Sequence, residues 1–219
     1  MSPHRRLGGL YAIADSALLS GTRLTHGVAQ AITGGAAVIQ YRDKDTDPRR
    51  RHTQALALAQ LCRVYDVPLI INDDMLLART AGAAGVHLGR GDPSVEAARK
   101  LLGHDAIIGV SCYNNLSMAV EAQARGADYV AFGAFFASPT KPDAVRADAG
   151  LLRQAKSQLQ CPIVAIGGIT PDNAAALIEA GADALAVING VFGQDDPAAA
   201  ARQFTRLFPS TARQPGIPG

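Results

Sequence analysis

Eight short apolar runs recur along the chain, separated by Ala-rich segments with helical periodicity. Runs of this kind, without polar alternation, are typical of strands buried on both faces, as in a parallel sheet covered by helices. The predicted strands are Leu10–Ala14, Val38–Tyr41, Leu69–Ile71, Gly85–Leu88, Ile107–Val110, Tyr129–Phe132, Ile163–Ile166 and Ala184–Val187. The predicted helices include Pro48–Tyr65, Val95–Leu102, Leu116–Arg125, Leu151–Gln158 and Asn173–Ala180.

A Gly-Gly or Gly-Ala pair stands between several helical segments and the strands that follow them. Gly34-Gly35, Gly82-Ala83, Gly126-Ala127 and Gly181-Ala182 each follow a helical stretch. Glycine favours the left-handed conformation past a helix C-terminus, so these pairs indicate turns from helix to strand. Eight strands alternating with helices predict an α/β fold, a single (β/α)8 barrel, over a doubly wound sheet. The first strand also lacks the GxGxxG pattern of dinucleotide-binding sheets.

Length and cysteine use indicate one domain in a reducing compartment. A chain of 219 residues can bury one sizeable core, and we expect a barrel domain over residues 1–212 with a disordered tail at 213–219. The three cysteines lie far apart without a CxxC motif, which argues against disulfides and zinc and favours a cytoplasmic location. No apolar run is long enough to span a bilayer, and Met1–Gly9 lacks the apolar core of a signal peptide.

Charge is balanced along the chain. The formal net charge is +2, and no basic block is interleaved with aromatic residues. The densest basic run, Arg49 to Arg51, begins a predicted helix, and we interpret it as a solvated face. Small-molecule ligands are therefore favoured over nucleic acid or a membrane surface. The pattern predicts no particular oligomeric state.

Cationic and amide side chains follow the second predicted strand. In a (β/α)8 barrel the functional residues lie at the carboxyl ends of the strands. Gln40, Arg42 and Lys44 alternate along an extended path, so their side chains are expected to point the same way. Such a set suits an anionic ligand, and the alternative is a solvated strand end.

Carboxylates follow the third and fourth predicted strands. Asn72, Asp73 and Asp74 end the third strand, and we expect Asp74 to cap the next helix. Asp92 precedes Pro93 and could act as a cap in the same way. Two carboxylates, phosphate oxygens and water form a usual Mg²⁺ site, so Asp73 and Asp92 are predicted metal ligands.

The fifth and sixth strand ends supply hydroxyl groups and a lysine. Ser111 offers a hydroxyl for hydrogen bonding, because no Ser-His-Asp arrangement is evident, while His87 and Cys112 are predicted to be packed side chains. The loop 133–142 contains two phenylalanines, which argue against an ordinary surface loop. This loop could cover the site and present Lys141 to a phosphate.

The last two strand ends carry glycines in place of charges. Gly167-Gly168 and Ile188-Asn189-Gly190 lie where barrel enzymes commonly bind phosphate through backbone N–H groups. The sequence thus predicts a cationic, metal-bearing site for a diphosphate and a neutral cradle for a monophosphate. With no evident acid–base pair, the pattern favours chemistry driven by leaving-group stabilisation.

Taken in order, these strand ends resemble the thiamine-phosphate synthase family from about Leu10 to Phe192. The matching segments are QYRDK, IINDD, GVHLGRGD, IGVS, ADYVAFG with SPTK, AIGGI and the strand-eight turn. The resemblance implies a transferase that joins 4-amino-5-hydroxymethyl-2-methylpyrimidine diphosphate to a thiazole phosphate. It also implies that pyrophosphate departs first and that the thiazole nitrogen captures the resulting pyrimidine-methyl cation.

The resemblance also implies a role for each strand end. The pyrimidine diphosphate would contact Gln40, Arg42, Lys44, Asn72, Ser111 and Lys141. The thiazole phosphate would contact Ser138, Pro139, Thr140, Gly168, Ile188 and Asn189. Mg²⁺ would be held by Asp73 and Asp92.

Four places depart from the common family pattern. Arg90 replaces a frequent Gln, Cys112-Tyr113 a frequent His, Ser138 a Thr, and Asn189-Gly190 a Ser-Ala turn. None of these changes removes a charged group that the chemistry needs.

Two other functions stay open from the sequence. One is a thiazole tautomerase-like isomerase on the same fold, which needs neither a diphosphate nor a metal. The other is a non-catalytic sensor of phosphate ligands. The joint presence of Lys44, Asp73, Asp92 and Lys141 favours the synthase over the isomerase.

Overall fold

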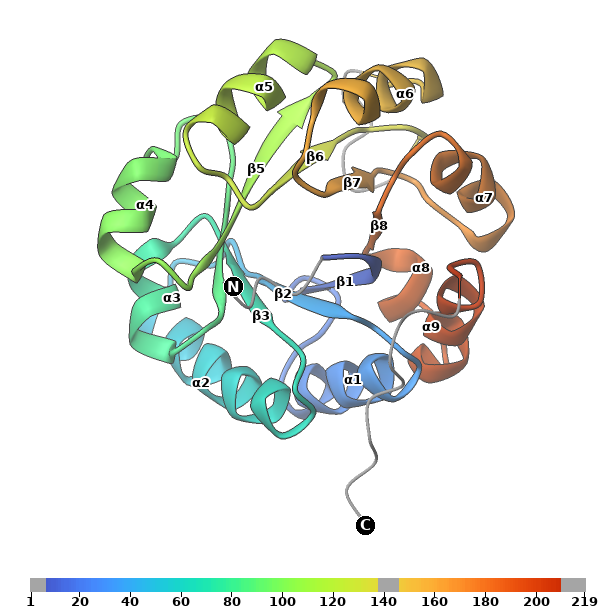
Figure 1. Cartoon of the computed structure of the whole chain (residues 1–219). Helices are drawn as coiled ribbons and strands as arrows, with labels where there is room; N and C mark the ends of the chain where they lie inside the picture. Colours follow the sequence, from blue (N-terminus) through green and yellow to red (C-terminus); the bar gives the residue numbers. More distant parts are fainter. Residues whose placement is uncertain (1–6, 138–145, 210–219) are drawn as a thin grey trace.

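Eight parallel strands close into a barrel in chain order, with β1 paired to both β2 and β8 (Figure 1). The structure is a computed structural model that describes residues 7–137 and 146–209. The strands are β1 Gly9–Asp15, β2 Val38–Arg42, β3 Leu69–Asn72, β4 Gly85–Leu88, β5 Ile107–Tyr113, β6 Tyr129–Phe132, β7 Ile163–Ile166 and β8 Ala184–Val187. The predicted (β/α)8 barrel and all of its predicted strands are confirmed.

Four strands run further than the apolar pattern predicts. β1, β2, β3 and β5 continue through Asp15, Arg42, Asn72 and Ser111, which are polar residues at their carboxyl ends. The apolar run ends before these residues, but the parallel strand pairing continues through them. Asp15 pairs with Arg42, and Asn72 pairs with His87. The polar side chains therefore start from the rigid sheet and not from loops.

Helices form an outer ring around the strands (Figure 1). They are α1 Thr22–Thr33, α2 Pro48–Val64, α3 Met75–Ala81, α4 Val95–Leu102, α5 Leu116–Ala124, α6 Ala149–Gln158, α7 Pro171–Glu179, α8 Asn189–Phe192 and α9 Pro197–Thr205. The left-handed turn predicted after α3 is confirmed, since Gly82 has a φ of 65°. The glycines before β2, β6 and β8 also have positive φ values.

Helix capping confirms the role expected for Asp74 and decides the role of Asp92, which the sequence left open. Asp74 caps α3 by accepting a hydrogen bond from the Leu77 N–H at 2.8 Å, as predicted. α4 is capped instead by Ser94, which accepts from the Ala97 N–H at 3.2 Å. Asp92 is therefore not a cap, and its carboxylate is available for other contacts.

The first and last helices pack against each other across the closure of the barrel. Gly34, at the end of α1, lies so close to α9 that an added Cβ would be 2.4 Å from the Ala198 carbonyl oxygen. The Thr205 hydroxyl also donates to the Gly34 carbonyl at 3.1 Å. A glycine is thus needed where the two ends of the fold meet.

Side chains alternate between the barrel interior and the layer under the helices. The interior cluster holds Leu7, Tyr11, Ile13, Val38, Ile70, Tyr129, Ala131, Val164, Ala184 and Ala186. One interior position must be glycine, because a Cβ on Gly109 would lie 1.9 Å from Cζ of Tyr129. The barrel is therefore filled by side chains rather than open along its axis.

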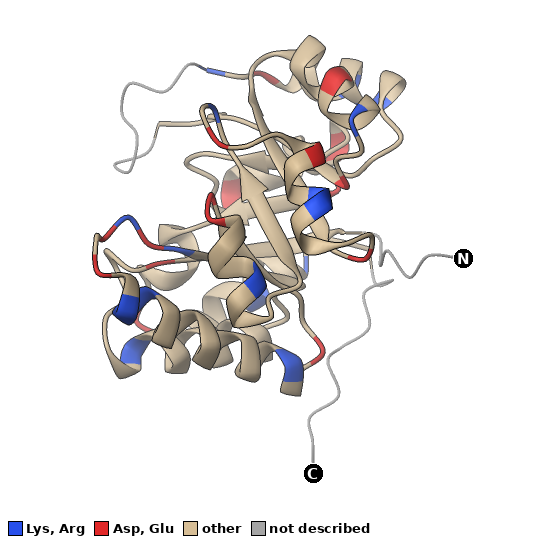
Figure 2. Ribbon diagram, turned by 90° about the vertical axis from the view of Figure 1, so that its left-hand side faces the viewer, with Lys and Arg blue, Asp and Glu red and all other residues tan. Residues whose placement is uncertain are grey.

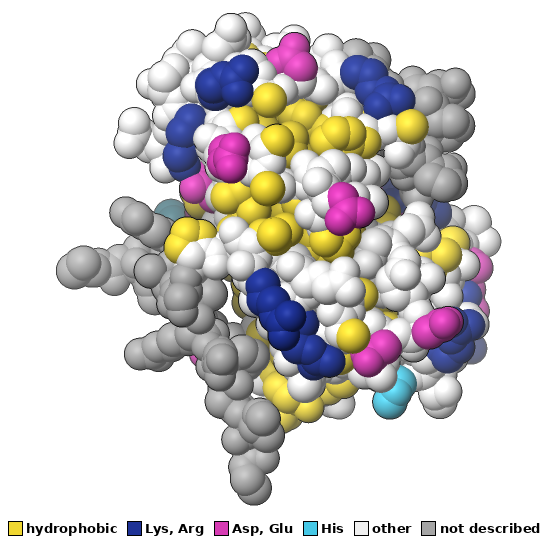
Figure 3. Space-filling view, turned by 90° about the vertical axis from the view of Figure 1, so that its right-hand side faces the viewer, with side chains coloured by type: hydrophobic (Ala, Val, Ile, Leu, Met, Phe, Trp, Pro, Cys, Tyr) yellow, Lys and Arg dark blue, Asp and Glu magenta, His cyan; other side chains and the backbone are white. Residues whose placement is uncertain are grey.

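The outer surface is mixed in character. On the side that carries α7 and α9, charged side chains of both signs lie scattered among apolar ones (Figure 3).

Within residues 7–137 and 146–209, no helix is long and apolar enough to cross a membrane. The tail expected at 213–219 lies outside the described residues.

Candidate active site

Charged residues of both signs gather in loops at one end of the barrel, away from the labelled N-terminus (Figure 2). The carboxyl ends of the parallel strands must share one end of a barrel, so the polar strand ends form a single mouth. An open cavity of about 510 Å³ lies at the rim of this mouth, lined partly by Lys44, Asn72 and Asp73. It is polar on the strand side and apolar at Met75 and Leu76.

Arg42 is paired with a carboxylate that sequence reasoning missed. Its guanidinium donates to Asp15, whose side chain is only 6% exposed. The other oxygen of Asp15 accepts from the Ala17 N–H at 3.0 Å. Asp15 therefore orients Arg42 over the mouth, and the only signal for it was an acidic residue at the end of an apolar strand.

Lys44, Asp73 and Asp92 come together from three strand ends. The Lys44 ammonium forms an ion pair with Asp73, whose backbone has a positive φ of 65°. The Asp73 N–H donates to the His87 carbonyl at 2.8 Å, which fixes the end of β3 beside β4. Asp92 accepts from the Gly89 N–H at 2.6 Å.

The two carboxylates face each other closely enough to affect ionisation. Burial raises the pKa of Asp92, and the adjacent Asp73 carboxylate raises it further, while the Gly89 N–H and Lys44 act in the opposite direction. A cation between the carboxylates would relieve their repulsion. No group of three or more His, Cys, Asp or Glu side chains suited to a metal occurs in the part of the chain that the structure describes. The two facing carboxylates of Asp73 and Asp92 are hard oxygen donors, which would fit a cation such as Mg²⁺ that takes its other ligands from substrate and water.

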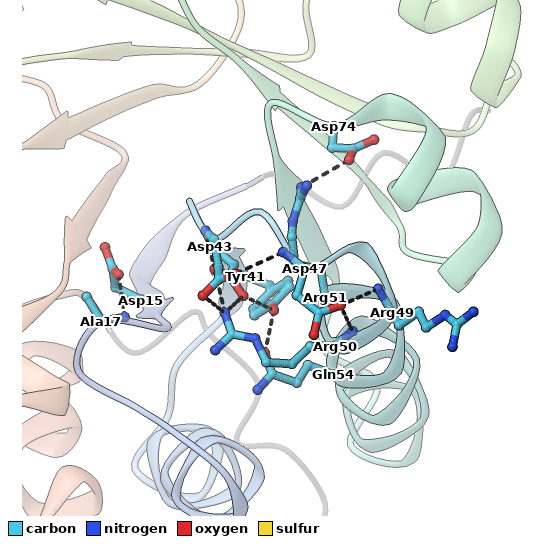
Figure 4. Close-up of polar contacts among 11 residues, drawn as sticks. Asp15, Ala17, Tyr41, Asp43, Asp47, Arg49, Arg50, Arg51, Gln54 and Asp74 are labelled. Atoms are coloured by element: carbon cyan, nitrogen blue, oxygen red, sulfur yellow. Dashed lines mark hydrogen bonds and ion pairs between the residues drawn. The ribbon is translucent and has the colours of Figure 1, made fainter.

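A buried cluster holds the β2–α2 loop that carries Lys44 (Figure 4). The fully buried Asp43 side chain accepts from the Tyr41 hydroxyl at 2.8 Å and from Nη2 of Arg50 at 2.9 Å. Burial alone would raise the pKa of Asp43, but hydrogen bonds and the charge of Arg50 outweigh it and lower that pKa. Arg50 also contacts Asp45 at 3.0 Å.

The interpretation of the basic run as a solvated face is wrong for two of its three residues. Arg50 closes the loop cluster, and Arg51 pairs with Asp74 at 3.0 Å, joining α2 to the cap of α3 (Figure 4). Only Arg49 is exposed. The partners come from other loops, which a count of basic residues cannot reveal.

A hydrogen-bonded chain crosses the barrel interior beneath the mouth. Gln40 Nε2 donates to the Tyr11 hydroxyl at 2.8 Å, and the Tyr11 and Tyr129 hydroxyls are 2.8 Å apart. Tyr129 contacts Nδ1 of His87 at 2.9 Å, and Nε2 of His87 lies 2.8 Å from the Ser111 hydroxyl oxygen. We call Gln40, Tyr11, Tyr129, His87 and Ser111 the interior chain.

The interior chain refines three predictions. His87 is buried, as expected, but it joins Tyr129 to Ser111 rather than only filling space. Its partner on Nδ1 is a phenol and not a carboxylate, so the contact with Ser111 does not make a Ser-His-Asp triad. Sequence reasoning missed the two tyrosines because they stand inside apolar strands, where an aromatic ring counts as core.

Cys112 and Tyr113 follow Ser111 at the end of β5. Cys112 is fully buried, which confirms it as a packed side chain, and burial raises the pKa of its thiol to about 12. The Tyr113 hydroxyl accepts from the Arg90 N–H at 3.1 Å, and the Arg90 guanidinium lies 4.9 Å from the Tyr113 ring centre. Two of the family departures are thus in contact with each other.

The glycines after β7 have a packing reason that the sequence did not show. Gly168 has a φ of 62°, and a Cβ there would lie 2.4 Å from the Ala137 carbonyl oxygen. The loop after β6 therefore fills the space that a side chain would need. After β8, residues Asn189–Phe192 form the short helix α8, with Ile188 at its N-cap position.

The loop between β6 and α6 is described as far as Ala137 and again from Arg146. Phe135 is buried and Phe136 is half-buried, which agrees with a loop that packs on the barrel. The predicted site residues Ser138, Pro139, Thr140 and Lys141 lie outside the described residues.

Known proteins resemble the chain over most of its length. The family model for thiamine monophosphate synthase matches residues 10–191. The chain belongs to the thiamine monophosphate synthase family. A thiamine-phosphate synthase from Nitrosococcus oceani is 55% identical, over 92% of this chain and 93% of that relative. Another from Thiobacillus denitrificans is 53% identical, over 92% and 95%.

A solved structure agrees with this assignment. Thiamine phosphate pyrophosphorylase from Pyrococcus furiosus superimposes with a TM-score of 0.81 at 34% identity, covering 91% of this chain and 94% of that one. The predicted fold and the predicted enzyme class, a thiamine monophosphate synthase, are confirmed. The matches give no support to the isomerase or the sensor alternative.

Proposed function

We propose that the mouth binds two phosphorylated substrates of thiamine phosphate synthesis at separate sites. The pyrimidine diphosphate would lie on the β2–β5 side, held by Gln40, Arg42, Lys44, Asn72 and Ser111. The observation that carries this assignment is the meeting of Arg42, Lys44 and two facing carboxylates at adjacent strand ends. Such a set suits a diphosphate that arrives with a divalent cation.

Asp73 and Asp92 would hold Mg²⁺, together with diphosphate oxygens and water. When bound, the ion supplies positive charge to the departing pyrophosphate. Lys44 and Arg42 would donate to the same oxygens; in the part of the chain that the structure describes, Lys44 pairs with Asp73 and Arg42 with Asp15. Lys141, from the loop after β6, would complete the set, as the family resemblance implies.

The reaction needs little proton transfer from the protein. Nε2 of His87 contacts the Ser111 hydroxyl, and its Nδ1 contacts the Tyr129 hydroxyl, an arrangement that positions Ser111 for hydrogen bonding. We therefore propose that the β2–β5 side accelerates departure of pyrophosphate by neutralising charge as it develops. The thiazole nitrogen would then capture the pyrimidine-methyl cation, whose charge the ring amine stabilises.

The thiazole phosphate would lie on the β7–β8 side. Gly168, Ile188 and Asn189 would contact its phosphate through the backbone, with Ser138, Pro139 and Thr140 contributing from the neighbouring loop. Gly168 lies beside Ala137, so the two segments proposed for this site are adjacent. A cytoplasmic location is part of the proposal, and the free thiols of Cys62, Cys112 and Cys161 support it.

The test is the release of pyrophosphate with each component left out in turn. We expect release only when the pyrimidine diphosphate, the thiazole phosphate and Mg²⁺ are all present. Undiminished turnover in excess chelator would contradict the metal assignment. A sensor would bind both substrates without releasing pyrophosphate, and an isomerase would act without the diphosphate.

A further inference from the structure

The interior chain joins two side chains proposed to touch the same substrate. Gln40 starts from β2 and Ser111 from β5, and three buried residues, Tyr11, Tyr129 and His87, connect them. Gln40 and Ser111 therefore stand at the two ends of the interior chain. Each can form further hydrogen bonds beyond the one that it makes within the chain.

The middle of the interior chain is tightly held. Tyr11 is 1% exposed and Tyr129 is fully buried. The His87 and Tyr129 rings stack with centroids 5.6 Å apart, and Gly109 leaves the space that the Tyr129 ring occupies. Water therefore cannot replace a missing partner, and each hydroxyl must bond within the chain.

The Gln40 amide sets the direction of the chain, because the nitrogen that faces Tyr11 can only donate. Burial raises the pKa of both tyrosines, so each keeps one hydroxyl proton. Because Gln40 donates to Tyr11, the Tyr11 proton is directed to Tyr129. The Tyr129 proton then goes to Nδ1 of His87.

The direction continues through the imidazole. With Nδ1 acting as an acceptor, the imidazole proton is on Nε2, which donates to the Ser111 oxygen. The Ser111 hydroxyl proton is then left for another acceptor. At the other end, Gln40 uses Nε2 in the chain and keeps Oε1 as an acceptor.

We propose that Tyr11, Tyr129 and His87 are positioning residues that give opposite polarity to the two ends of the interior chain. Gln40 presents an acceptor to the substrate, and Ser111 presents a donor. Resting on the proposed function, this polarity matches a pyrimidine whose ring amine donates to Gln40 and whose diphosphate accepts from Ser111. A ring with a carbonyl oxygen in place of the amine would bring two hydrogen-bond acceptors together, that oxygen and Oε1 of Gln40. We expect this to lower the affinity about 10- to 100-fold.

The first test reads the direction without any substrate. Long-range ¹H–¹⁵N spectra of the full chain, labelled on its five histidines, distinguish the two neutral imidazole tautomers. The His87 signal is identified by its loss in His87→Asn. We expect a proton on Nε2 only. A proton on Nδ1, or on both nitrogens, would overturn the proposed direction.

The second test reads the consequence for recognition. Binding of the pyrimidine diphosphate and of its 4-oxo counterpart is measured by calorimetry, without the thiazole phosphate. We expect the wild type to prefer the amino compound by about 10- to 100-fold. Tyr129→Phe breaks the chain, frees the Gln40 amide to turn, and should reduce this preference at least about 5-fold.

Tyr65→Phe, a change in a half-buried tyrosine outside the interior chain, is the matched control and should keep the full preference. A merely structural role for Tyr129 would weaken both compounds equally, and an unchanged ratio would therefore overturn the proposal. If Tyr129→Phe fails to fold, the tautomer of wild-type His87 still decides the direction. Wild-type protein that neither binds the pyrimidine diphosphate nor releases pyrophosphate would instead overturn the proposed function.

Discussion

The two sides of the barrel mouth carry their polar groups differently. On the β2–β5 side, charged side chains pair with one another, Arg42 with Asp15 and Lys44 with Asp73. On the β7–β8 side, the predicted contacts are mainly backbone groups around Gly168 and the start of α8. On the β2–β5 side, cations and carboxylates that are proposed to bind a diphosphate and its metal ion can neutralise one another before these ligands bind. On the β7–β8 side, phosphate binding through backbone N–H groups depends on the path of the chain.

The largest expected effect is on the charged side. Asp92→Ala should lower kcat by roughly 10²- to 10³-fold, because it removes half of the proposed metal site. Steady-state release of pyrophosphate measures the loss. The control is Asp196→Ala, which removes the cap of α9 and should cost about 1 kcal/mol of stability with little loss of turnover. Wild-type kcat in Asp92→Ala would show that Asp92 holds no essential metal.

A smaller effect is expected from the loop cluster on the same side. Arg50→Met removes the cation that holds Asp43, so the loop carrying Lys44 should loosen. We expect KM for the pyrimidine diphosphate to rise about 10-fold, with KM for the thiazole phosphate unchanged. Arg49→Met changes the exposed neighbour and should behave as the wild type. Equal effects of the two substitutions would mean that bulk charge matters and not the Asp43 contact.

The backbone side should respond to shape. Gly168→Ala would place a Cβ against the Ala137 carbonyl oxygen at a left-handed φ. It should therefore raise KM for the thiazole phosphate about 3- to 10-fold. KM for the pyrimidine diphosphate should not change. Gly103→Ala imposes a similar positive φ where a Cβ has open space, and should alter neither KM. A change confined to the pyrimidine diphosphate would reverse the assignment of the two sides.

The smallest effect concerns stability in the absence of metal. The folded-state pKa of Asp92 is raised, so the stability linked to its protonation is present below the unfolded pKa and is lost as pH rises through the folded value. At neutral pH, Asp92→Asn should therefore raise the Tm of metal-free protein, by about 1–2 °C after allowance for solvent screening. Thermal melts at pH 4 and pH 7 should show the gain only at pH 7. A gain that is equal at both pH values would point to a cause other than the facing carboxylates.

Sequence reasoning predicted the barrel well because strand burial is a local signal. All eight strands and the polar strand ends could be located from apolar runs and the residues that follow them. The pairing of Asp15 with Arg42 could not, because it depends on the register between β1 and β2. The contact between Tyr11 and Tyr129 joins residues 118 positions apart, and hydropathy treats both as core.

The role of Arg50 was missed for a related reason. Its helix position favours solvent, but the β2–α2 loop returns Asp43 to it. Asp73 and Asp92 were predicted together because they lie in the loops after two neighbouring strands, and the structure brings their carboxylates side by side. Contacts that follow from strand order can thus be predicted, while contacts that depend on loop paths require coordinates.

The packing of α1 against α9 at Gly34 has a consequence for how the protein is made. The first strand and helix leave the ribosome early, but the surface that Gly34 fits is supplied by α9 near the end of the chain. Until β8 and α9 have been synthesised, β1 keeps an unpaired edge that can join another nascent chain. β8 therefore closes the exposed edge of the earliest strand, and α9 completes the packing against α1, so we expect the nascent chain to be most prone to aggregation before both have been made.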